Sequence, residues 1–285
     1  MADLNREDIQ PLIDVALAED IGTGDITSDW TVPEQKTATA NFVSRAIGVV
    51  AGLSVAEWVF ASVDPEAKLE AHLADGDSVR PGDLVATVSG PARALLTGER
   101  TALNFLQRMS GVATLTSRYV RLVAGTGATI LDTRKTIPGW RRLDKYAVSV
   151  GGGKNHRFGL FDMVLIKENH IEAADGIGPA VYGVRKHLNG TASDVKIEIE
   201  VRDLAELEEA IMASADWVML DNMNVDQMAE AVRLVRNQGG GPLLEASGNV
   251  ALTSVKEIAQ TGVDYISVGS LTHSASALDI SMLFQ

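Results

Sequence analysis

The chain has 285 residues, of which 46% are hydrophobic and 22% are charged, and its formal net charge is −13. This composition is typical of a soluble globular protein, and the acidic balance argues against an extended nucleic-acid-binding surface. No run of about 18 apolar residues predicts a membrane span, and the absence of cysteine excludes disulfides and thiolate sites. The N-terminal residues lack the features of a signal peptide, so we expect a cytoplasmic protein.

The first part of the chain predicts a small domain with both helices and strands. Residues Leu4–Glu19 have the apolar spacing of an amphipathic helix. Between Thr37 and Gly90, short β-like runs alternate with turns rich in Gly and Pro. A long helical pattern then runs from Ala92 to Val123. We place the end of this domain near Gly111 and assign it residues 1–111.

The second part, residues 112–273, repeats a strand followed by a helix. Six apolar runs end in a polar or small residue, and they are Ala128–Asp132, Asp162–Lys167, Val195–Glu200, Asp216–Asp221, Leu243–Ser247 and Val263–Val268. This spacing is typical of βα units and a parallel sheet. Capping boxes are predicted where Asp203 precedes Glu206, Asn224 precedes Gln227 and Ser254 precedes Glu257. No dinucleotide or Walker fingerprint is present, which favours an α/β barrel over a Rossmann sheet.

Positive charge is concentrated between Leu131 and His170. Eight of the 25 Lys and Arg residues fall there, and they are Arg134, Lys135, Arg141, Arg142, Lys145, Lys154, Arg157 and Lys167. Such a stretch in an acidic protein predicts binding of a small polyanion. Arg141, Arg142 and Lys145 share a helical pattern with Asp144, so we expect those three to form a solvated face instead.

In a parallel α/β barrel, residues that follow the strands meet at one mouth. The residues at these positions are Arg134, Lys135, Lys167, Glu200, Asp221, Ser247, Gly248, Asn249, Gly269, Ser270 and His273. The predicted site therefore combines cations, two carboxylates and two Gly/Ser loops suited to phosphate. His156 is a further candidate within the basic stretch, whereas His170 and His187 are expected to be ordinary surface or packing residues. No His spacing predicts a zinc site.

Several motifs, in order along nearly the whole chain, point to one family. They are Glu99–Leu106, Ser110–Thr114, Asp132–Thr136, Gly151–Gly153 with Asn155–Arg157, Ile166–Lys167 with Asn169–His170, Leu220–Asn222, Val268–Ser274 and Leu278–Ile280. Together they resemble quinolinate phosphoribosyltransferase, also called nicotinate-nucleotide pyrophosphorylase (carboxylating). One departure is Asn249, where the family usually has Gly. Since Asn tolerates a positive φ, we expect the loop to be retained.

The resemblance implies an α/β fold with two domains and a homodimer. An N-terminal α/β sandwich domain, residues 1–111, would precede an incomplete six-stranded parallel α/β barrel, residues 112–273. The tail, residues 274–285, would pack back on the first domain. The implied reaction, part of de novo NAD biosynthesis, transfers phosphoribosyl from phosphoribosyl pyrophosphate to quinolinate with decarboxylation. Its products are nicotinate mononucleotide, pyrophosphate and CO₂, and Mg²⁺ would accompany phosphoribosyl pyrophosphate.

The resemblance also implies roles for individual residues. Arg134, Arg157 and Lys167 would bind quinolinate beside His156, with Arg100 supplied by the partner subunit. The 5′-phosphate would lie on Gly248, Asn249, Gly269 and Ser270, with Lys135 and His273 assisting the phosphates. Glu200 and Asp221 would face the ribose and Mg²⁺, directly or through water. The catalytic set is then Glu200, Asp221, Lys135 and Lys167, and the substrate-binding set also includes Thr133, Ser247 and Val268.

Two alternatives stay open at the level of the sequence. One is a paralogous phosphoribosyltransferase of the same fold with another acceptor, and the cation set of Arg100, Arg134, His156, Arg157 and Lys167 argues against it because it suits a dicarboxylate. The other is a non-catalytic phosphosugar-binding barrel. Glu200 and Asp221 beside the cations argue against this second alternative.

Overall fold

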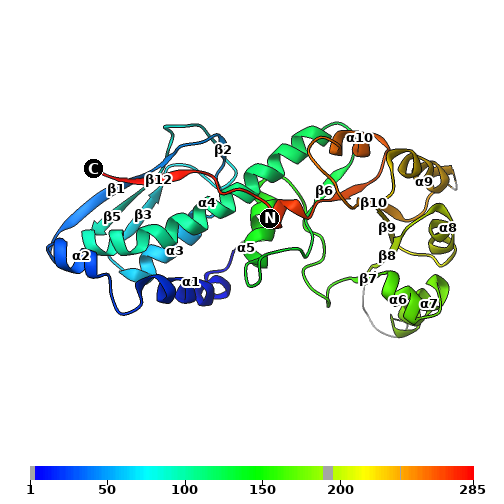
Figure 1. The fold of residues 1–285 in the computed structure, drawn as a ribbon, viewed down its shortest axis with the longest axis horizontal. Helices are drawn as coiled ribbons and strands as arrows, with labels where there is room; N and C mark the ends of the chain where they lie inside the picture. The colour runs from blue at the N-terminus through cyan, green and yellow to red at the C-terminus, as the bar shows by residue number, and fades with distance from the viewer. Residues whose placement is uncertain (1–3, 189–194, 238) are drawn as a thin grey trace. The chain divides into compact units, whose positions relative to one another are not determined.

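The computed structural model describes residues 4–188, 195–237 and 239–285, which divide into two compact units. The first unit comprises the chain up to residue 117 together with residues 136–152 and 271–285, and the second comprises residues 118–135 and 153–270 (Figure 1). No described helix is long and apolar enough to cross a membrane.

The first unit contains an antiparallel sheet of four strands in the order β12-β1-β5-β3. These strands are β1 (Thr37–Ser44), β3 (Lys68–Ala71), β5 (Leu84–Pro91) and β12 (Ile280–Phe284), and β2 (Gly48–Val49) pairs separately with β4 (Ser78–Val79). The helices are α1 (Arg6–Ile21), α2 (Ile26–Thr31), α3 (Leu53–Val63), most of α4 (Ala92–Val123), and α5 (Arg141–Val150). The C-terminal strand β12 pairs with β1, as Figure 1 shows.

Local sequence explains the ends of α1 and the path of the C-terminal segment. The side chain of Asn5 accepts a hydrogen bond from the backbone N–H of Glu7 and caps α1, while Gly22 ends the helix at φ +55°. The long helix α4 has the bounds that the apolar pattern predicted. A Cβ at Gly111 would collide with the carbonyl oxygen of Ser276, so only glycine lets the C-terminal segment pass this close to α4.

The second unit is built on a parallel sheet of six strands in the order β6-β11-β10-β9-β8-β7. The strands are β6 (Thr129–Leu131), β7 (Val164–Ile166), β8 (Ile197–Val201), β9 (Trp217–Asp221), β10 (Leu243–Ser247) and β11 (Tyr265–Ser267). Because β6 and β7, which are consecutive in the sequence, lie at opposite edges, the sheet forms an incomplete barrel. The predicted fold class is confirmed.

Helices α6 (Glu168–Ala173), α7 (Ile177–Leu188), α8 (Leu204–Met212), α9 (Val225–Asn237) and α10 (Val255–Gln260) connect these strands, and α11 (Ser270–His273) follows β11. Figure 1 shows α6–α9 arrayed along one side of β7–β10. The strands are largely buried, because the helices cover the face of the sheet that would otherwise meet water. Polar side chains lie at the C-terminal ends of several strands, for example Asp221 at the end of β9 and Ser247 at the end of β10.

Two of the three predicted helix caps form. Asn224 and Gln227 exchange backbone-to-side-chain hydrogen bonds of 3.0 and 2.9 Å. Asp203 accepts from the N–H of Glu206 at 2.9 Å, although Glu206 accepts in turn from Arg202. The predicted cap at Ser254 is wrong. Its hydroxyl bonds back to Ala251 at 3.1 and 3.3 Å, because the turn before α10 offers these backbone groups first.

The predicted solvated face on α5 is also wrong in part. Arg142 is exposed and pairs with Asp8 at 3.3 Å, but Asp144 and Lys145 are buried. Arg108 on α4 donates to Asp144 at 3.1 Å. Burial raises the pKa of Asp144, and the neighbouring Arg108 charge opposes that rise. The charge pattern of α5 could not reveal this, because the partner comes from another helix.

Candidate active site

A cavity of about 350 Å³ lies at the C-terminal ends of the strands in the second unit. Nine of the predicted site residues line it, and they are Thr133, Arg134, Lys135, His156, Arg157, Lys167, Glu200, Asp221 and Ser247. Leu165, Met219, Glu245 and Ser267 complete the lining. The residues come from all six strands or their following loops and from the segment before β7, so the parallel sheet gathers side chains that are far apart in sequence.

The guanidinium groups of Arg134 and Arg157 form a cationic part of this cavity. Burial lowers the pKa of Arg157, and the positive charge of Arg134 lowers it further. Arg157 also donates to the carbonyl oxygen of Met163 at 3.3 Å, which fixes one edge of its guanidinium. Next to Arg134 in the sequence, the hydroxyl of Thr133 accepts from the N–H of Lys135 at 3.0 Å and shapes the turn after β6. Two cations that repel each other in a partly buried cavity favour an anionic ligand.

His156 is fixed at its backbone and at both ring nitrogens. Its N–H donates to the buried carboxylate of Asp132 at 2.9 Å. Its Nδ1 accepts the N–H of Arg157 at 2.7 Å, so the ring proton belongs on Nε2. Nε2 lies 3.0 Å from Glu198 and 3.4 Å from Glu245. Only 6% of the His156 side chain is exposed.

Glu198 and Glu245 were missed by sequence reasoning. Both carboxylates are fully buried, on β8 and β10, and His156 is their one ion-pair partner among the described residues. Burial alone would lower the pKa of His156, but these two carboxylates raise it above its usual value. Burial raises the pKa of Glu198 to about 7, against the opposing effect of His156. The hydrogen bond that Nδ1 accepts from Arg157 opposes the rise in the pKa of His156, because a second proton on Nδ1 would break this bond, and it keeps the single ring proton on Nε2.

The ligand atoms of His156, Glu198 and Glu245 all lie within 4.8 Å of one another, a donor set that could hold a cation. The imidazole already faces both carboxylates, however, and the ring of Trp217 lies 5.6 Å from that of His156. The only signal in the sequence was an acidic residue inside each of two apolar strands, at positions that the pleat directs inward.

Lys167 and Glu200 connect the ends of β7 and β8. The ammonium of Lys167 contacts the carboxylate of Glu200, and both side chains line the cavity. The backbone N–H of Lys167 donates to the Nδ1 atom of His170 at 3.0 Å, so His170 has a structural role at the start of α6. A cation and an anion are thereby held side by side at the mouth of the barrel.

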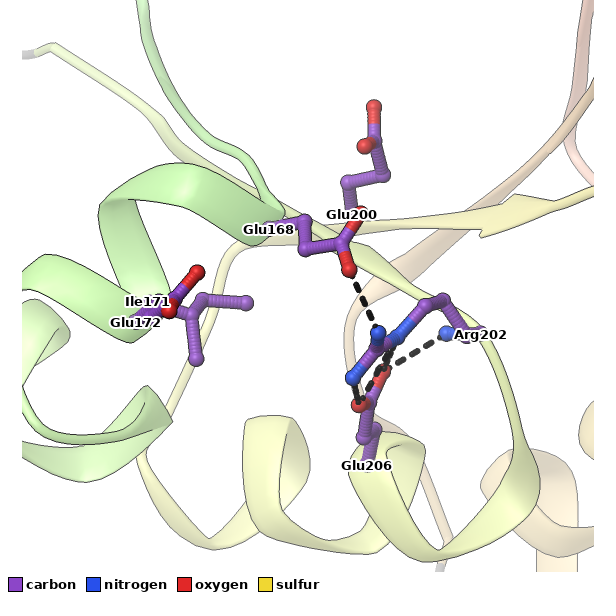
Figure 2. Close-up of a pocket in the computed structure, with 6 residues that line it drawn as sticks. All are labelled: Glu168, Ile171, Glu172, Glu200, Arg202 and Glu206. Carbon is purple, nitrogen blue, oxygen red and sulfur yellow. Dashed lines mark hydrogen bonds and ion pairs between the residues drawn. The ribbon is translucent and has the colours of Figure 1, made fainter.

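Glu200 also borders a second cavity, of about 320 Å³, which is shown in Figure 2. Arg202 lies there between Glu168, at 2.7 Å, and Glu206, at 2.6 Å. Figure 2 shows the Glu200 carboxylate pointing away from these three side chains. The positive charge of Arg202 is therefore balanced by Glu168 and Glu206. Glu200 forms its ion pair with Lys167 and lines the first cavity.

The loop after β10 is tied to the end of β9 through two asparagines. Asn222 donates from its side chain to Asp221 at 2.8 Å and accepts from the side chain of Asn249 at 3.2 Å. Asn249 has φ +51°, the left-handed conformation that was expected where the family usually has Gly. Gly248 has φ +96°, and a Cβ there would collide with the Asn222 side chain.

The loops that follow β10 and β11 are brought together by Tyr119 at the end of α4. Its hydroxyl lies 3.4 Å from the carbonyl oxygen of Val250 and 3.5 Å from the hydroxyl of Ser270. The backbone N–H of Val268 donates to Leu131 at 2.9 Å. In the described part of the chain, the 350 Å³ cavity is not lined by Gly248, Asn249, Val268, Gly269 or Ser270.

Two predicted site residues belong to the first unit. Arg100 is exposed on α4, and no described residue forms a hydrogen bond or an ion pair with its side chain. The exposed ring of His273 contacts the hydroxyl of Ser274 at 2.6 Å.

Comparison with known proteins decides the family. Residues 25–110 match the N-terminal domain of quinolinate phosphoribosyl transferase, and residues 112–283 match its C-terminal domain. The chain belongs to the quinolinate phosphoribosyltransferase family. It is 46% identical to quinolinate phosphoribosyltransferase (decarboxylating) 1b of Nicotiana tabacum, over 96% of this chain and 82% of that relative. It is 42% identical to the probable nicotinate-nucleotide pyrophosphorylase (carboxylating) of Bacillus subtilis, over 98% and 94%.

A solved structure agrees with this membership. The nicotinate-nucleotide pyrophosphorylase of Francisella tularensis superposes with a TM-score of 0.93 at 41% identity, covering 99% of this chain and 98% of that one. The two-part architecture, with an antiparallel sheet and a six-stranded parallel sheet, is therefore the architecture of a quinolinate phosphoribosyltransferase.

Proposed function

We propose that this chain transfers the phosphoribosyl group of phosphoribosyl pyrophosphate to quinolinate and removes one carboxylate, giving nicotinate mononucleotide, pyrophosphate and CO₂ for NAD biosynthesis. The observation that carries the proposal is one cavity that combines the cations Arg134, Arg157 and Lys167 with the carboxylates Glu200 and Asp221. The names of the relatives describe the same reaction. A cavity of about 350 Å³ is also the size of a small-molecule site.

Quinolinate is a pyridine with two adjacent carboxylates, and the cationic part of the cavity suits it. A guanidinium binds a planar carboxylate through two parallel hydrogen bonds. Bound carboxylates would relieve the repulsion between Arg134 and Arg157 that lowers the pKa of Arg157. Lys167 would turn from Glu200 toward the substrate or be shared between the two. The buried Met219 and Leu165 supply apolar surface for the pyridine ring.

The two carboxylates suit the ribose end of the second substrate. As the bond from the anomeric carbon to pyrophosphate breaks, positive charge develops on the sugar, and Glu200 and Asp221 would stabilise it electrostatically. The pyridine nitrogen attacks that carbon and becomes positively charged. When the adjacent carboxylate leaves as CO₂, the electron pair of the broken bond is stabilised by this nitrogen, and a proton then takes the place of CO₂. The chain needs to supply no covalent nucleophile.

The same carboxylates fit a magnesium ion. Mg²⁺ prefers hard oxygen ligands at partly open sites and keeps several waters. Glu200 and Asp221 offer such oxygens at the ends of the neighbouring strands β8 and β9, and neither is fully buried. Bound Mg²⁺ would neutralise charge on pyrophosphate. Lys135, which lines the cavity after β6, would add a further positive charge toward the phosphates.

The phosphate of the second substrate would lie on the loops after β10 and β11. Gly248, Asn249, Gly269 and Ser270 provide backbone N–H groups there, and Tyr119 links the two loops. Val268 leads into the second of these loops, and His273 would assist the phosphates. We further propose a cytoplasmic homodimer in which Arg100 completes the quinolinate site of the partner. The absence of a described partner for the exposed Arg100 side chain supports this assignment.

Mixing two inactive variants tests the shared site. Arg100→Ala and Arg157→Ala homodimers should each be nearly inactive, because every site lacks one cation. Hybrids would contain one intact site, so about a quarter of all sites should recover after random subunit exchange. No recovery, with exchange verified by mass spectrometry, would place Arg100 in its own subunit's site or outside any site.

A pyrophosphate release assay separates the candidate functions. The protein is incubated with phosphoribosyl pyrophosphate and Mg²⁺, with quinolinate, with nicotinate or with no acceptor. We expect release that depends on quinolinate. Release with a different acceptor would indicate a paralogous phosphoribosyltransferase, and binding of phosphoribosyl pyrophosphate without any release would indicate a non-catalytic barrel.

A further inference from the structure

Two buried carboxylates lie behind the ring of His156, in the interior of the barrel. Glu198 on β8 and Glu245 on β10 are 0% exposed, and Nε2 of His156 lies 3.0 and 3.4 Å from them. In the described part of the chain, none of their oxygens accepts a hydrogen bond, and the His156 ring at these distances is their one ion-pair partner. The pair belongs to none of the substrate contacts proposed above.

Charged side chains are unusual at these two positions, because both lie buried among apolar residues. Buried carboxylates with few donors are costly, and apolar side chains of similar volume usually fill such positions at no loss of stability. The flanking residues Ile197, Ile199, Leu244 and Ala246 are buried and apolar. Two acidic residues in such strands therefore indicate a role directed at their one partner, the His156 ring.

The ring connects this pair to the cationic part of the cavity. Nε2 faces the carboxylates, and Nδ1 accepts the backbone N–H of Arg157 at 2.7 Å. The backbone of His156 is held by Asp132 at 2.9 Å. A ring that is fixed at Nε2 in turn fixes the acceptor for Arg157. Displacement of the ring would release the segment from which the Arg157 guanidinium enters the cavity.

We propose that Glu198 and Glu245 are positioning residues for the quinolinate site, which hold the His156 ring and, through its Nδ1 atom, the backbone of Arg157. The inference rests on the proposed function, since it assigns Arg157 to quinolinate. The carboxylate oxygens act through their close contact with Nε2. Glu198 is not among the residues that line the cavity, whereas Glu245 also lines it. Phosphoribosyl pyrophosphate would bind at other side chains and would not be affected.

Support of the ring by the carboxylates and simple electrostatic repulsion should change quinolinate binding in opposite directions. A negative charge beneath a site for a dianion repels the ligand, so its removal alone should tighten quinolinate binding. Loss of the acceptor for Nε2 should instead weaken quinolinate binding, because Arg157 is displaced. Glutamine keeps an acceptor oxygen at nearly the same place without the charge, whereas leucine keeps the volume and removes the acceptor.

The experiment compares Glu198→Gln with Glu198→Leu, and the exposed Glu230 on α9 provides the matched control variants Glu230→Gln and Glu230→Leu. The KM of each substrate, kcat and the thermal unfolding midpoint are measured for all four and for the wild type. We expect Glu198→Leu to raise the KM for quinolinate about 10-fold or more. Its KM for phosphoribosyl pyrophosphate should not change. Glu198→Gln should stay within about 3-fold of the wild type, because its acceptor is retained.

An independent measurement follows the ring itself. Nitrogen-15 NMR of the imidazoles should show His156 of the wild type with its proton on Nε2 and an unprotonated Nδ1 that accepts from Arg157. This pattern should be kept in Glu198→Gln and lost or averaged in Glu198→Leu. If Glu198→Leu gives no folded protein, the same comparison is made with Glu245→Gln and Glu245→Leu.

Three results would overturn the inference. An unchanged KM for quinolinate in the folded leucine variant would show that the ring needs no such support. A lower KM in both variants would show that the charges act only by repulsion. Similar losses for both substrates together with a lower unfolding midpoint would show a merely structural role. A wild-type protein without quinolinate-dependent activity would instead refute the proposed function.

Discussion

The backbone N–H of Arg157 donates to the Nδ1 atom of the preceding residue, His156, at 2.7 Å. This bond joins a cation in the cavity to a ring whose other nitrogen faces the buried Glu198 and Glu245. The proposed support of the cationic part of the cavity from the barrel interior implies that the geometry of its guanidiniums should matter as much as their charge.

Replacement of Arg134 by Lys tests that geometry. One ammonium keeps the charge but cannot form two parallel hydrogen bonds with a carboxylate. We expect Arg134→Lys to raise the KM for quinolinate at least about 10-fold, the cost of losing a charged hydrogen bond. Steady-state kinetics check this, with Arg142→Lys on the exposed face of α5 as control. Near-normal kinetics would mean that Arg134 does not bind a carboxylate.

The roles of Glu200 and Asp221 are tested by their amides. Glu200→Gln and Asp221→Asn should lower kcat about 100-fold or more, as expected when an electrostatic stabiliser of a transition state is lost. The affinity for quinolinate, measured by calorimetry, should change little. Glu208→Gln, at an exposed position on α8, is the matched control. A large loss of quinolinate affinity with unchanged turnover would show that these carboxylates act on quinolinate and that their assignment to the second substrate is wrong.

The loop after β10 offers two contrasting substitutions. Asn249→Gly removes the 3.2 Å bond to Asn222 but suits the positive φ, so the KM for phosphoribosyl pyrophosphate should rise only about 3-fold. Gly248→Ala places a Cβ against Asn222 at φ +96° and should raise the same KM far more. Quinolinate KM is the internal control. Equal effects of both substitutions, or a shift confined to quinolinate, would argue against a phosphate loop here.

The pH dependence of stability should report the buried carboxylates. Burial raises the pKa of Glu198 from its usual value of 4.5 to about 7 in the folded protein. The folded state therefore holds this proton more tightly, and the stability from it is full below pH 4.5 and lost as the pH rises through 7. Relative to the wild type, Glu198→Gln should become more stable between about pH 5 and 8, by up to roughly 3 kcal/mol.

Denaturant unfolding of both proteins across that range, without substrates or added metal, measures the difference. Glu230→Gln, at an exposed position, should show no such trend. A difference between the Glu198→Gln and wild-type proteins that stays constant with pH would show that Glu198 does not change its protonation in this range.

Much of the fold could be predicted because it depends on local periodicity. The bounds of α4 and the six strands of the second unit follow from apolar spacing, and the cap of α9 follows from Asn224 and Gln227. Ser254 was misassigned because a side chain can bond to several nearby backbone groups, and the sequence does not rank them. The burial of Lys145 and Asp144 depends on Arg108, which belongs to another helix.

The grouping of the candidate residues could be predicted where they follow strands, since a parallel sheet must bring these positions together. Thus Arg134, Lys167, Glu200 and Asp221 all line one cavity. Glu198 and Glu245 could not be assigned in the same way. Each lies inside a strand, and its only ion-pair partner among the described residues is His156, which belongs to the loop before β7. Only the folded barrel shows that the three side chains meet.

The most direct test of the central claim follows the fate of the carboxylate next to the ring nitrogen. The protein is supplied with phosphoribosyl pyrophosphate, Mg²⁺ and quinolinate labelled with carbon-13 in that carboxylate, and labelled CO₂, pyrophosphate and the nucleotide are quantified together. The account predicts equal amounts of all three, with nicotinate mononucleotide as the nucleotide. In a parallel assay with nicotinate in place of quinolinate, it predicts no turnover. Pyrophosphate release without labelled CO₂, or efficient turnover of nicotinate, would contradict it.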